Sequence, residues 1–372
     1  MNAVTLSKID RKFRNSLTRY APPNLSVKMY SLGRKYFLSQ LKDDIPSQST
    51  DIPPDLARTL WGINFRSPIF NAAGIFKEGD CYEMTAMQGA GAYLGGTGTW
   101  NSRAGNTKNN IHLPFVPYPK SGSSSNYMGL PNKSDSITSE KVSKIKKIRG
   151  TPIGWSVMAS PDLEGVAQNR GLVHGMIWYE RAGVDFIEWN VSCPNLNYKK
   201  CESLEYQLSY VEKNYLKTRK RNIPVIIKIS NDKTTKELPY LLDLMFEKGF
   251  DGINIGGTST QYDILRDKIH PDERKLFDYF TKTFKGGISG RPLKERSLEL
   301  TARAVEYLKA GGPSQEFHVI RTGGIENWND IIESERVGVK LNQWFTGYFE
   351  DFSKYGHDVY KKLYEQRKTN KV

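Results

Sequence analysis

The sequence has little cysteine and no long hydrophobic run, and each absence excludes a class of protein. Cys81, Cys193 and Cys201 are the only cysteines in 372 residues, so a disulfide framework is excluded and a reducing compartment is favoured. No apolar run approaches the ~20 residues that a membrane-spanning helix needs. The N-terminus also lacks an apolar block followed by small residues, so we expect no secretory signal peptide.

The usual metal and nucleophile patterns are missing as well. None of the five histidines forms a His-x-x-x-His pair, and no Cys-x-x-Cys occurs. A Walker phosphate loop and a Gly-x-Ser-x-Gly motif are also absent. We therefore expect no metal site, and an organic cofactor anchored through a phosphate fits the sequence better.

Positive charge is in excess. The chain has 54 Lys and Arg against 40 Asp and Glu, a formal net charge of +14, and residues 1–50 hold nine of the bases and three of the acids. Such a balance suits an anionic partner, namely nucleic acid, anionic lipid or a phosphate-bearing cofactor. A solvated basic surface is the alternative. A hydrophobic fraction of 38% is ordinary for a globular protein with a sizeable core.

Residues 1–50 are expected to form a basic helical arm. Ala21-Pro22-Pro23-Asn24 predicts a helix start near Ser26, and an irregular apolar stripe follows among the bases. The arm either lies on an anionic membrane surface or docks on the main domain. A polar, proline-rich linker over 43–54 leads into the second predicted domain, residues 51–372. The stripe consists of Val27, Tyr30, Leu32, Phe37, Leu38 and Leu41.

After the linker, short apolar runs alternate with stretches of helical spacing. One predicted helix places Leu298, Ala302, Val305 and Leu308 on one face, and others cover about 162–182, 204–219 and 236–248. This alternation predicts an α/β fold, a (β/α)₈ barrel with a short helical N-terminal extension. A doubly wound open sheet is the competitor. The predicted parallel strands are 68–73, 92–96, 153–158, 184–191, 225–229, 252–255, 318–321 and 341–345.

Residues 97–135 are predicted to form a long insertion after the second strand. The segment is rich in Gly, Ser, Asn and Pro, and we expect it as a loop. In a barrel it would lie at the C-terminal face, where active sites form.

Several polar residues follow predicted strands. Cys193 lies between Asn190 and Asn195 and is either a nucleophile or base, or a buried structural thiol. Lys228 stands in an apolar strand and needs an anionic partner unless it reaches solvent. Lys77 is a weaker candidate, because it is equally well a surface charge of a loop.

Glycine pairs also follow late strands, at 256–257, 286–287 and 323–324. Gly323-Gly324 follows the seventh strand and Phe345-Thr346-Gly347 follows the eighth, where barrels commonly bind phosphate. Because turns need glycine in any case, each pair alone is weak evidence.

Four motifs together resemble the dihydroorotate dehydrogenase family. They are Asn190-Val191-Ser192-Cys193-Pro194-Asn195, Gly286-Gly287-Ile288-Ser289-Gly290-Arg291-Pro292-Leu293, Thr322-Gly323-Gly324-Ile325 and Asn71-Ala72-Ala73-Gly74, and the similarity runs in order over about 55–365. The resemblance implies an FMN-binding barrel that oxidises dihydroorotate to orotate in de novo pyrimidine biosynthesis. A base removes the C5 proton while hydride leaves C6 for FMN.

The resemblance also implies residue roles. Cys193 matches the base, and Lys228 matches a lysine whose charge would stabilise reduced flavin. Substrate binding falls to Asn126, Met128, Gly129, Leu130, Asn190, Asn195 and Thr258. FMN binding falls to Ala73, Gly74, Lys77, Thr97, Asn190, Lys228, Gly257, Gly290, Gly323, Gly324, Phe345 and Thr346.

Features of two classes are mixed. The cysteine base and Met128-Gly129-Leu130-Pro131-Asn132 resemble the cytosolic class 1 enzymes, whereas Gly95-Gly96-Thr97 and the segment 21–37 look like the membrane-associated class 2. Quinone is therefore the expected electron acceptor, and fumarate is the alternative. The matching location is peripheral, on the cytoplasmic side of the inner membrane through residues 1–50, with a soluble cytoplasmic protein as the alternative.

Two residues depart from the family pattern. Gly257-Thr258 stands where an asparagine usually contacts orotate, which keeps open another FMN barrel acting on a pyrimidine-like or enone substrate. Arg321 replaces a small residue and either adds a phosphate contact or narrows the FMN site. The dihydrouridine synthases share an Asn-x-x-Cys-Pro motif, but only about 25 residues follow the eighth strand, too few for their RNA-binding domain, so no nucleic acid is expected. A non-catalytic phosphate-binding barrel is also disfavoured, because burying both Lys228 and Cys193 is costly unless they take part in a reaction.

Overall fold

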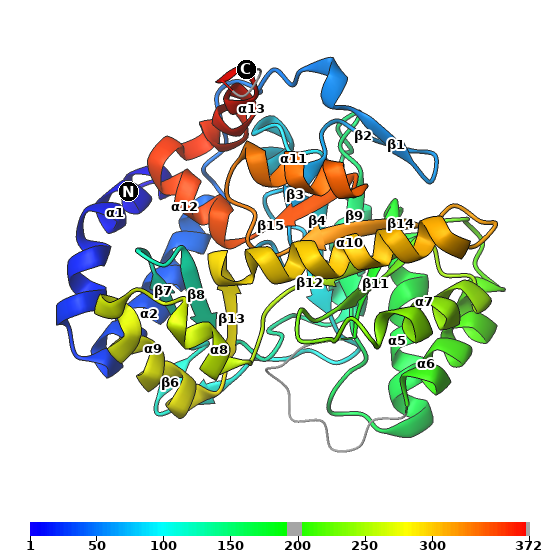
Figure 1. Ribbon diagram of the computed structural model, residues 1–372, viewed down its shortest axis with the longest axis horizontal. Helices are drawn as coiled ribbons and strands as arrows, with labels where there is room; N and C mark the ends of the chain where they lie inside the picture. The colour runs from blue at the N-terminus through cyan, green and yellow to red at the C-terminus, as the bar shows by residue number, and fades with distance from the viewer. Residues whose placement is uncertain (192–202, 370–372) are drawn as a thin grey trace.

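The computed structural model describes residues 1–191 and 203–369, and a parallel eight-stranded sheet forms its centre (Figure 1). The sheet order is β3-β15-β14-β12-β11-β10-β9-β4, with all neighbours parallel. All eight predicted strands are confirmed. Their bounds are β3 (Ile69–Asn71), β4 (Tyr93–Gly98), β9 (Ile153–Val157), β10 (Phe186–Asn190), β11 (Val225–Ile229), β12 (Gly252–Gly256), β14 (His318–Thr322) and β15 (Leu341–Trp344).

A side chain helps to close the sheet into a barrel between β3 and β4. The Asn71 side-chain amide donates to the Leu94 carbonyl at 2.7 Å and its oxygen accepts from the Leu94 N–H at 3.2 Å. Three residues after Asn71, the Gly74 N–H donates to the Gly96 carbonyl of β4 at 2.9 Å. Because buried backbone groups need partners, the fully buried Asn71 takes the place of a missing ladder bond at this seam. The barrel fold is therefore confirmed over the open-sheet alternative.

Helices cover the outside of the barrel, and a hairpin closes its amino-terminal end. The hairpin of β1 (Arg58–Leu60) and β2 (Ile63–Phe65) packs Leu60 and Phe65 on inward-facing residues such as Phe186. The predicted helices near 162–182, 204–219 and 236–248 are confirmed. The outer helices are α3 (Tyr82–Met87), α5 (Gly165–Arg181), α6 (Leu204–Val211), α7 (Leu238–Glu247), α10 (Lys294–Gly311), α11 (Trp328–Val337), α12 (Thr346–Tyr355) and α13 (Val359–Thr369).

The face of α10 that turns inward differs from the prediction. Of the four apolar residues expected on one face, Val305 is buried, whereas Leu298, Ala302 and Leu308 are partly exposed. The buried side also carries Ser297 and Thr301. The Ser297 hydroxyl donates to the Gly323 carbonyl beneath the helix, and the Thr301 hydroxyl donates to the Ser297 carbonyl within it. Short polar residues therefore share the inner face, which a count of apolar letters misses.

The insertion at 97–135 is not the long loop that its composition predicts. Its strands β7 (Phe115–Tyr118) and β8 (Ser123–Asn126) form an antiparallel sheet with β13 (Gly287–Gly290), and β5 (Thr107–Lys108) pairs with β6 (Ile111–His112). Gly286-Gly287 therefore leads into β13 rather than following a barrel strand. The hydroxyls of Ser123 and Ser124 on β8 also bond to Ser289 on β13. Hydrogen bonds between strands therefore hold a sheet whose composition is typical of a loop. Around it lie α4 (Asp135–Ser143), α8 (Tyr262–Asp267) and α9 (Pro271–Phe284).

The N-terminal arm consists of two helices, α1 (Ala3–Tyr20) and α2 (Pro23–Leu41), and it docks on the rest of the chain. In Figure 1 the arm lies beside α12 and the small sheet. Val27 and Leu41 are buried, and the Phe37 ring lies 5.8 Å from that of Phe352 on α12. Leu32, part of the predicted stripe, is 62% exposed. In the described part of the chain, no helix has both the length and the apolar character needed to cross a bilayer.

Candidate active site

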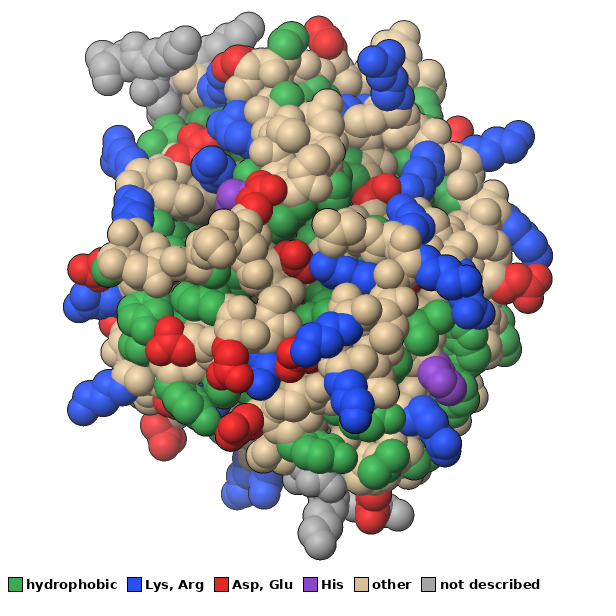
Figure 2. All heavy atoms as spheres, turned by 90° about the vertical axis from the view of Figure 1, so that its right-hand side faces the viewer, with side chains coloured by type: hydrophobic (Ala, Val, Ile, Leu, Met, Phe, Trp, Pro, Cys, Tyr) green, Lys and Arg blue, Asp and Glu red, His purple; other side chains and the backbone are tan. Residues whose placement is uncertain are grey.

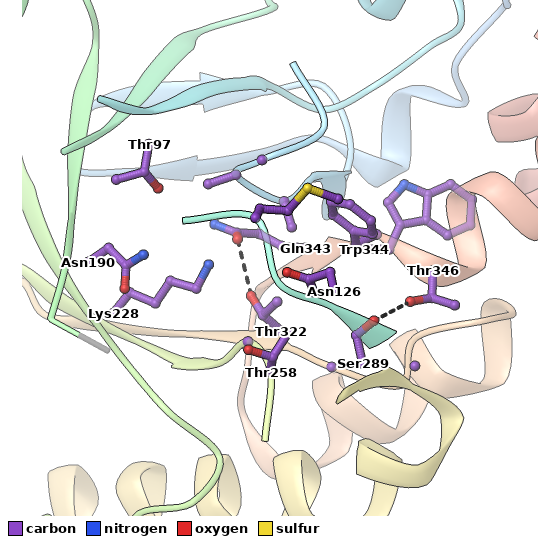
Figure 3. Close-up of a pocket in the computed structure, with 18 of the residues that line it drawn as sticks. Thr97, Asn126, Asn190, Lys228, Thr258, Ser289, Thr322, Gln343, Trp344 and Thr346 are labelled. Atoms are coloured by element: carbon purple, nitrogen blue, oxygen red, sulfur yellow. Dashed lines mark hydrogen bonds between the residues drawn. The ribbon is translucent and has the colours of Figure 1, made fainter. Parts of the chain in front are cut away.

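One pocket at the carboxyl ends of the barrel strands gathers most of the residues singled out from the sequence (Figure 3). Strand ends, the small sheet and the arm all contribute to its wall. Cys193 and Asn195 lie outside the described residues, so the positions of this base and this amide stay predictions. The pocket is lined by Ala73, Gly74, Lys77, Thr97, Asn126, Met128, Gly129, Leu130, Asn190, Lys228, Gly257, Thr258, Gly290, Gly323, Gly324, Phe345 and Thr346.

A buried ion pair forms the floor of this pocket. Lys228 on β11 is 7% exposed, so it does not reach solvent, and its Nζ lies 3.5 Å from Oε1 of Glu188 on β10. The other Glu188 oxygen accepts from the side-chain amides of Asn254 and Gln343, both at 2.7 Å. These two hydrogen bonds hold the Glu188 carboxylate beside Lys228, and the pairing offsets the cost of burying the lysine. Sequence reasoning missed Glu188, although a glutamate inside an apolar strand was the available signal.

A hydroxyl fixes the orientation of the two amides in this layer. The Thr322 hydroxyl at the end of β14 lies 3.1 Å from Gln343 Oε1 (Figure 3) and 2.8 Å from Asn254 Oδ1, within donating distance of both. With their oxygens directed to Thr322, both amides direct their N–H groups to Glu188. The floor is therefore a single polar network whose cation is presented to the pocket.

Glycines and a helix start form a cradle at one end of the pocket. Gly323 and Gly324 have φ of +124° and +73°, and a Cβ at Gly324 would overlap the backbone of Lys294. Thr346, the first residue of α12, lies 3.0 Å through its hydroxyl from that of Ser289 (Figure 3). Exposed N–H groups at a helix N-terminus and in glycine turns bind phosphate. The donor set therefore fits a phosphate-bearing cofactor.

The small sheet supplies the opposite wall. Asn126 ends β8, and the following segment with Met128 and Gly129 enters the pocket. Arg103 holds this segment by donating to the Gly129 carbonyl at 3.1 Å, and Asn132 donates to the Leu130 carbonyl at 2.8 Å. These hydrogen bonds fix a wall that carries an amide side chain, which suits a planar polar ligand.

The arm contributes a pocket residue that sequence reasoning missed. Arg34 on α2 lines the pocket, with Nη1 3.9 Å from the Met128 sulfur and its guanidinium 5.7 Å from the Phe115 ring centroid. No carboxylate of the described residues pairs with Arg34, and burial lowers its pKa to about 10, so it remains cationic at neutral pH. Because Arg34 is one of nine bases in residues 1–50, no local pattern distinguishes it.

Both expectations for Arg321 are wrong. Its fully buried side chain points away from the pocket, where Nε donates to Ser297 Oγ at 3.0 Å and Nη2 donates to the Lys294 carbonyl at 2.9 Å. The alternation of a strand explains this, because Thr322 takes the inward position next to it. Arg321 therefore neither contacts a phosphate nor narrows the pocket.

Gly257 and Thr258 both line the pocket where an asparagine was expected. Gly257 has a φ of +123°, and a Cβ there would meet Lys228 Cε at 3.6 Å, an ordinary contact. The pocket is therefore wider beside Lys228 than an asparagine would leave it.

Comparison with known proteins supports the same family. A model of the family described as dihydroorotate dehydrogenase matches residues 55–366. Relatives named "dihydroorotate dehydrogenase (quinone)" come from Arthrobacter sp. (29% identical, covering 79% of this chain and 81% of the relative) and Photobacterium profundum (26% identical, 82% and 86%).

Solved structures share the fold. Dihydroorotate dehydrogenase from Eimeria tenella in complex with ferulenol superposes with a TM-score of 0.74 at 19% identity, covering 90% of each chain. The ligand-free form gives a TM-score of 0.72 at 19% identity, covering 90% of this chain and 92% of the other. Since the family model spans well over half of the sequence, the chain belongs to the dihydroorotate dehydrogenase family of oxidoreductases.

Proposed function

We propose that this protein oxidises dihydroorotate to orotate with FMN and passes the electrons to a quinone. The observation that carries the proposal is that Lys228, held by Glu188, faces the same pocket as the glycine cradle and the amide side chains. A cation at one end, phosphate-binding N–H groups at the other and amides between them match a flavin lying beside a planar substrate.

The family is flavin-dependent, and we propose that the flavin bound here is FMN. Gly323, Gly324 and Thr346 would hold its phosphate, and Lys228 would lie at its ring. When bound, FMN supplies the acceptor for the hydride that leaves C6 of dihydroorotate. The Lys228 ammonium favours negative charge developing at the ring, and Glu188 keeps that ammonium in place.

The substrate would lie between the amides and the base. Asn126 and Asn190 present donors and acceptors to a carbonyl- and N–H-bearing ring, and Asn195 is proposed to do the same. Cys193 is the proposed base for the C5 proton, because a thiol needs only a modest lowering of its pKa to act near neutral pH. Proton loss from C5 and hydride loss from C6 leave the C5–C6 double bond of orotate, a precursor in pyrimidine biosynthesis.

Quinone is favoured over fumarate by the arm. Arg34 brings to the pocket a cation that pairs with no carboxylate of the residues described by the structure, and a quinone oxygen would accept its hydrogen bond. On the outside of α2, Leu32 and Tyr36 are 62% and 51% exposed, and they are proposed to contact a membrane that holds the quinone. We place the protein peripherally on the cytoplasmic side of that membrane.

An anaerobic rapid-mixing experiment tests the proposal. Dihydroorotate should bleach the visible absorbance of the bound flavin, and a quinone should restore it faster than fumarate does. If dihydroorotate leaves the flavin oxidised while another dihydropyrimidine bleaches it, the substrate assignment is wrong. If fumarate restores the absorbance and quinone does not, the acceptor assignment is wrong.

A further inference from the structure

The positive charge of the arm is concentrated in one groove. This groove, the basic groove, lies between α1, α12 and the turn that joins β7 to β8, at the edge of the molecule where α1 runs beside α12 (Figure 1). Glu350 is the one carboxylate among the described residues that line it. Its cationic lining consists of Lys8, Arg11, Lys12, Arg14, Lys120 and Lys354.

The positive charge of the basic groove is only partly compensated. Arg14, 9% exposed, forms the inner wall with Nη2 2.8 Å from Glu350 and 3.3 Å from Ser353 Oγ. Lys120 pairs with Asp272, and Lys354 Nζ lies 3.0 Å from Asp351. Across the described chain, neither Lys8, Arg11 nor Lys12 has an ion-pair partner, so the uncompensated charge comes from α1. Repulsion between like charges so close together disfavours an empty groove, and a bound anion relieves it.

The neighbouring side of α1 is apolar and exposed. Phe13 and Tyr20 are 58% and 72% exposed, and with Ile9 they follow helical spacing. Lys12, three residues after Ile9, lies at the border between this apolar side and the basic groove. A helix that buries such a side at the acyl boundary holds its flanking cations at the level of the lipid phosphates.

Figure 2 shows the right-hand side of Figure 1, away from the arm. On that face the Lys and Arg side chains of the described residues lie among Asp and Glu side chains.

We infer that the basic groove binds the phosphate of an anionic lipid headgroup. The lipid tails would pack on the apolar side of α1, while Lys8 and Lys12 meet the phosphate from α1 and Lys354 meets it from α12. The inference rests on the membrane contact proposed above and adds the class of lipid. It makes membrane binding selective for anionic lipid and ties it to a site shared by the arm and the barrel.

Sedimentation with vesicles tests the lipid class. The full chain with its flavin is mixed with vesicles of phosphatidylcholine, alone or with phosphatidylglycerol. We expect strong preference for the mixed vesicles, and loss of that preference at high salt. Equal binding to both kinds of vesicle would overturn the inference, while flavin reduction by dihydroorotate, measured on the same sample, separately tests the proposed function.

A matched pair of variants tests the groove itself. Lys8→Gln with Lys12→Gln removes two groove cations, and Lys213→Gln with Lys220→Gln removes two exposed cations that follow α6 on the barrel, away from the arm. At ~1 kcal/mol per basic residue, the first variant should bind mixed vesicles roughly 30-fold more weakly. The second should bind nearly as the parent does. Equal losses would mean a diffuse attraction without a site.

A third variant tests the barrel side of the groove, and a soluble anion tests the source of the phosphate. Lys354→Gln, on α12, should weaken vesicle binding by less than one groove lysine of α1 does, because Asp351 partly offsets its charge, whereas an arm acting alone would leave the binding unchanged. Glycerol phosphate should raise the melting temperature little at concentrations where the vesicles saturate. A large rise, together with no preference among vesicles, would assign the groove to a soluble phosphate and overturn the lipid assignment.

Discussion

At the scale of single residues, substitutions at Lys228 and Glu188 distinguish an effect on stability from an effect on the reaction. Lys228→Met leaves Glu188 buried without its cation, so the free energy of unfolding should fall by about 3 kcal/mol. Adding Glu188→Gln removes the orphaned charge while keeping an acceptor for Asn254 and Gln343, so most of that loss should be regained.

Flavin reduction should not follow stability in these variants. Both variants lack the Lys228 ammonium at the pocket floor, so anaerobic flavin reduction by dihydroorotate should stay slow in the double variant although its stability to denaturant recovers. Recovery of the reduction rate along with stability would show that Lys228 serves the fold and not the reaction.

Arg321 is a second residue with a stated structural task. Its Nε donates to Ser297 Oγ, and that hydroxyl lies 2.7 Å from the Gly323 carbonyl, so the guanidinium supports the proposed phosphate cradle from behind. Arg321→Met should lower the free energy of unfolding by about 3 kcal/mol, because several buried acceptors lose their donor. FMN affinity, followed by flavin fluorescence, should fall on the order of tenfold, the cost of about one hydrogen bond to phosphate.

A matched control separates the cradle from general stability. Ser334 accepts from Arg321 Nη1 at 3.0 Å, and its own hydroxyl donates to the Asp330 carbonyl rather than to Ser297 or the glycine turn. Ser334→Ala should therefore lower stability by about 1 kcal/mol and leave FMN affinity unchanged. If Ser334→Ala weakens FMN binding as much as Arg321→Met does, the effect is one of stability alone.

At the scale of elements, the barrel strands could be predicted and the small sheet could not. A parallel strand buried on both faces appears as a continuous apolar run, as in Val225–Ile229. β8 has the sequence Ser-Ser-Ser-Asn and carries no such signal, because its partners β7 and β13 come from distant parts of the chain. Arg34 escaped prediction for the same reason, since tertiary packing alone brings the arm to the pocket.

The turn between β14 and α11 provides a prediction at this scale. A Cβ at Gly324 would overlap the start of α10, whereas Gly183, also at positive φ, faces open space. Gly183→Ala should lower the free energy of unfolding by about 1 kcal/mol, because alanine disfavours this backbone conformation, and should leave FMN binding intact. Gly324→Ala should cost more and weaken FMN binding, because the turn must move away from α10. Equal effects in thermal unfolding and in fluorescence titration would contradict a cradle that depends on close approach.

At the scale of the whole molecule, the helical arm and the barrel meet at one pocket. The barrel provides the floor with Lys228 and the proposed phosphate cradle, and the arm provides Arg34. In the proposed reaction, dihydroorotate reduces the flavin at residues of the barrel, and quinone reoxidises the flavin at residues next to the arm. The two halves should therefore respond differently to changes in the arm.

Deletion of residues 1–50 should strongly impair quinone reduction and leave flavin reduction by dihydroorotate nearly intact. Because the deletion also uncovers Phe352 and other residues beneath the arm, Arg34→Gln in the full chain is the cleaner test. It keeps both helices and removes one charged donor, so quinone reduction should fall on the order of tenfold. Stopped-flow measurement of each half-reaction distinguishes the outcomes: an equal fall in both halves would make Arg34 part of the general pocket wall, and the acceptor would then have to enter from another side.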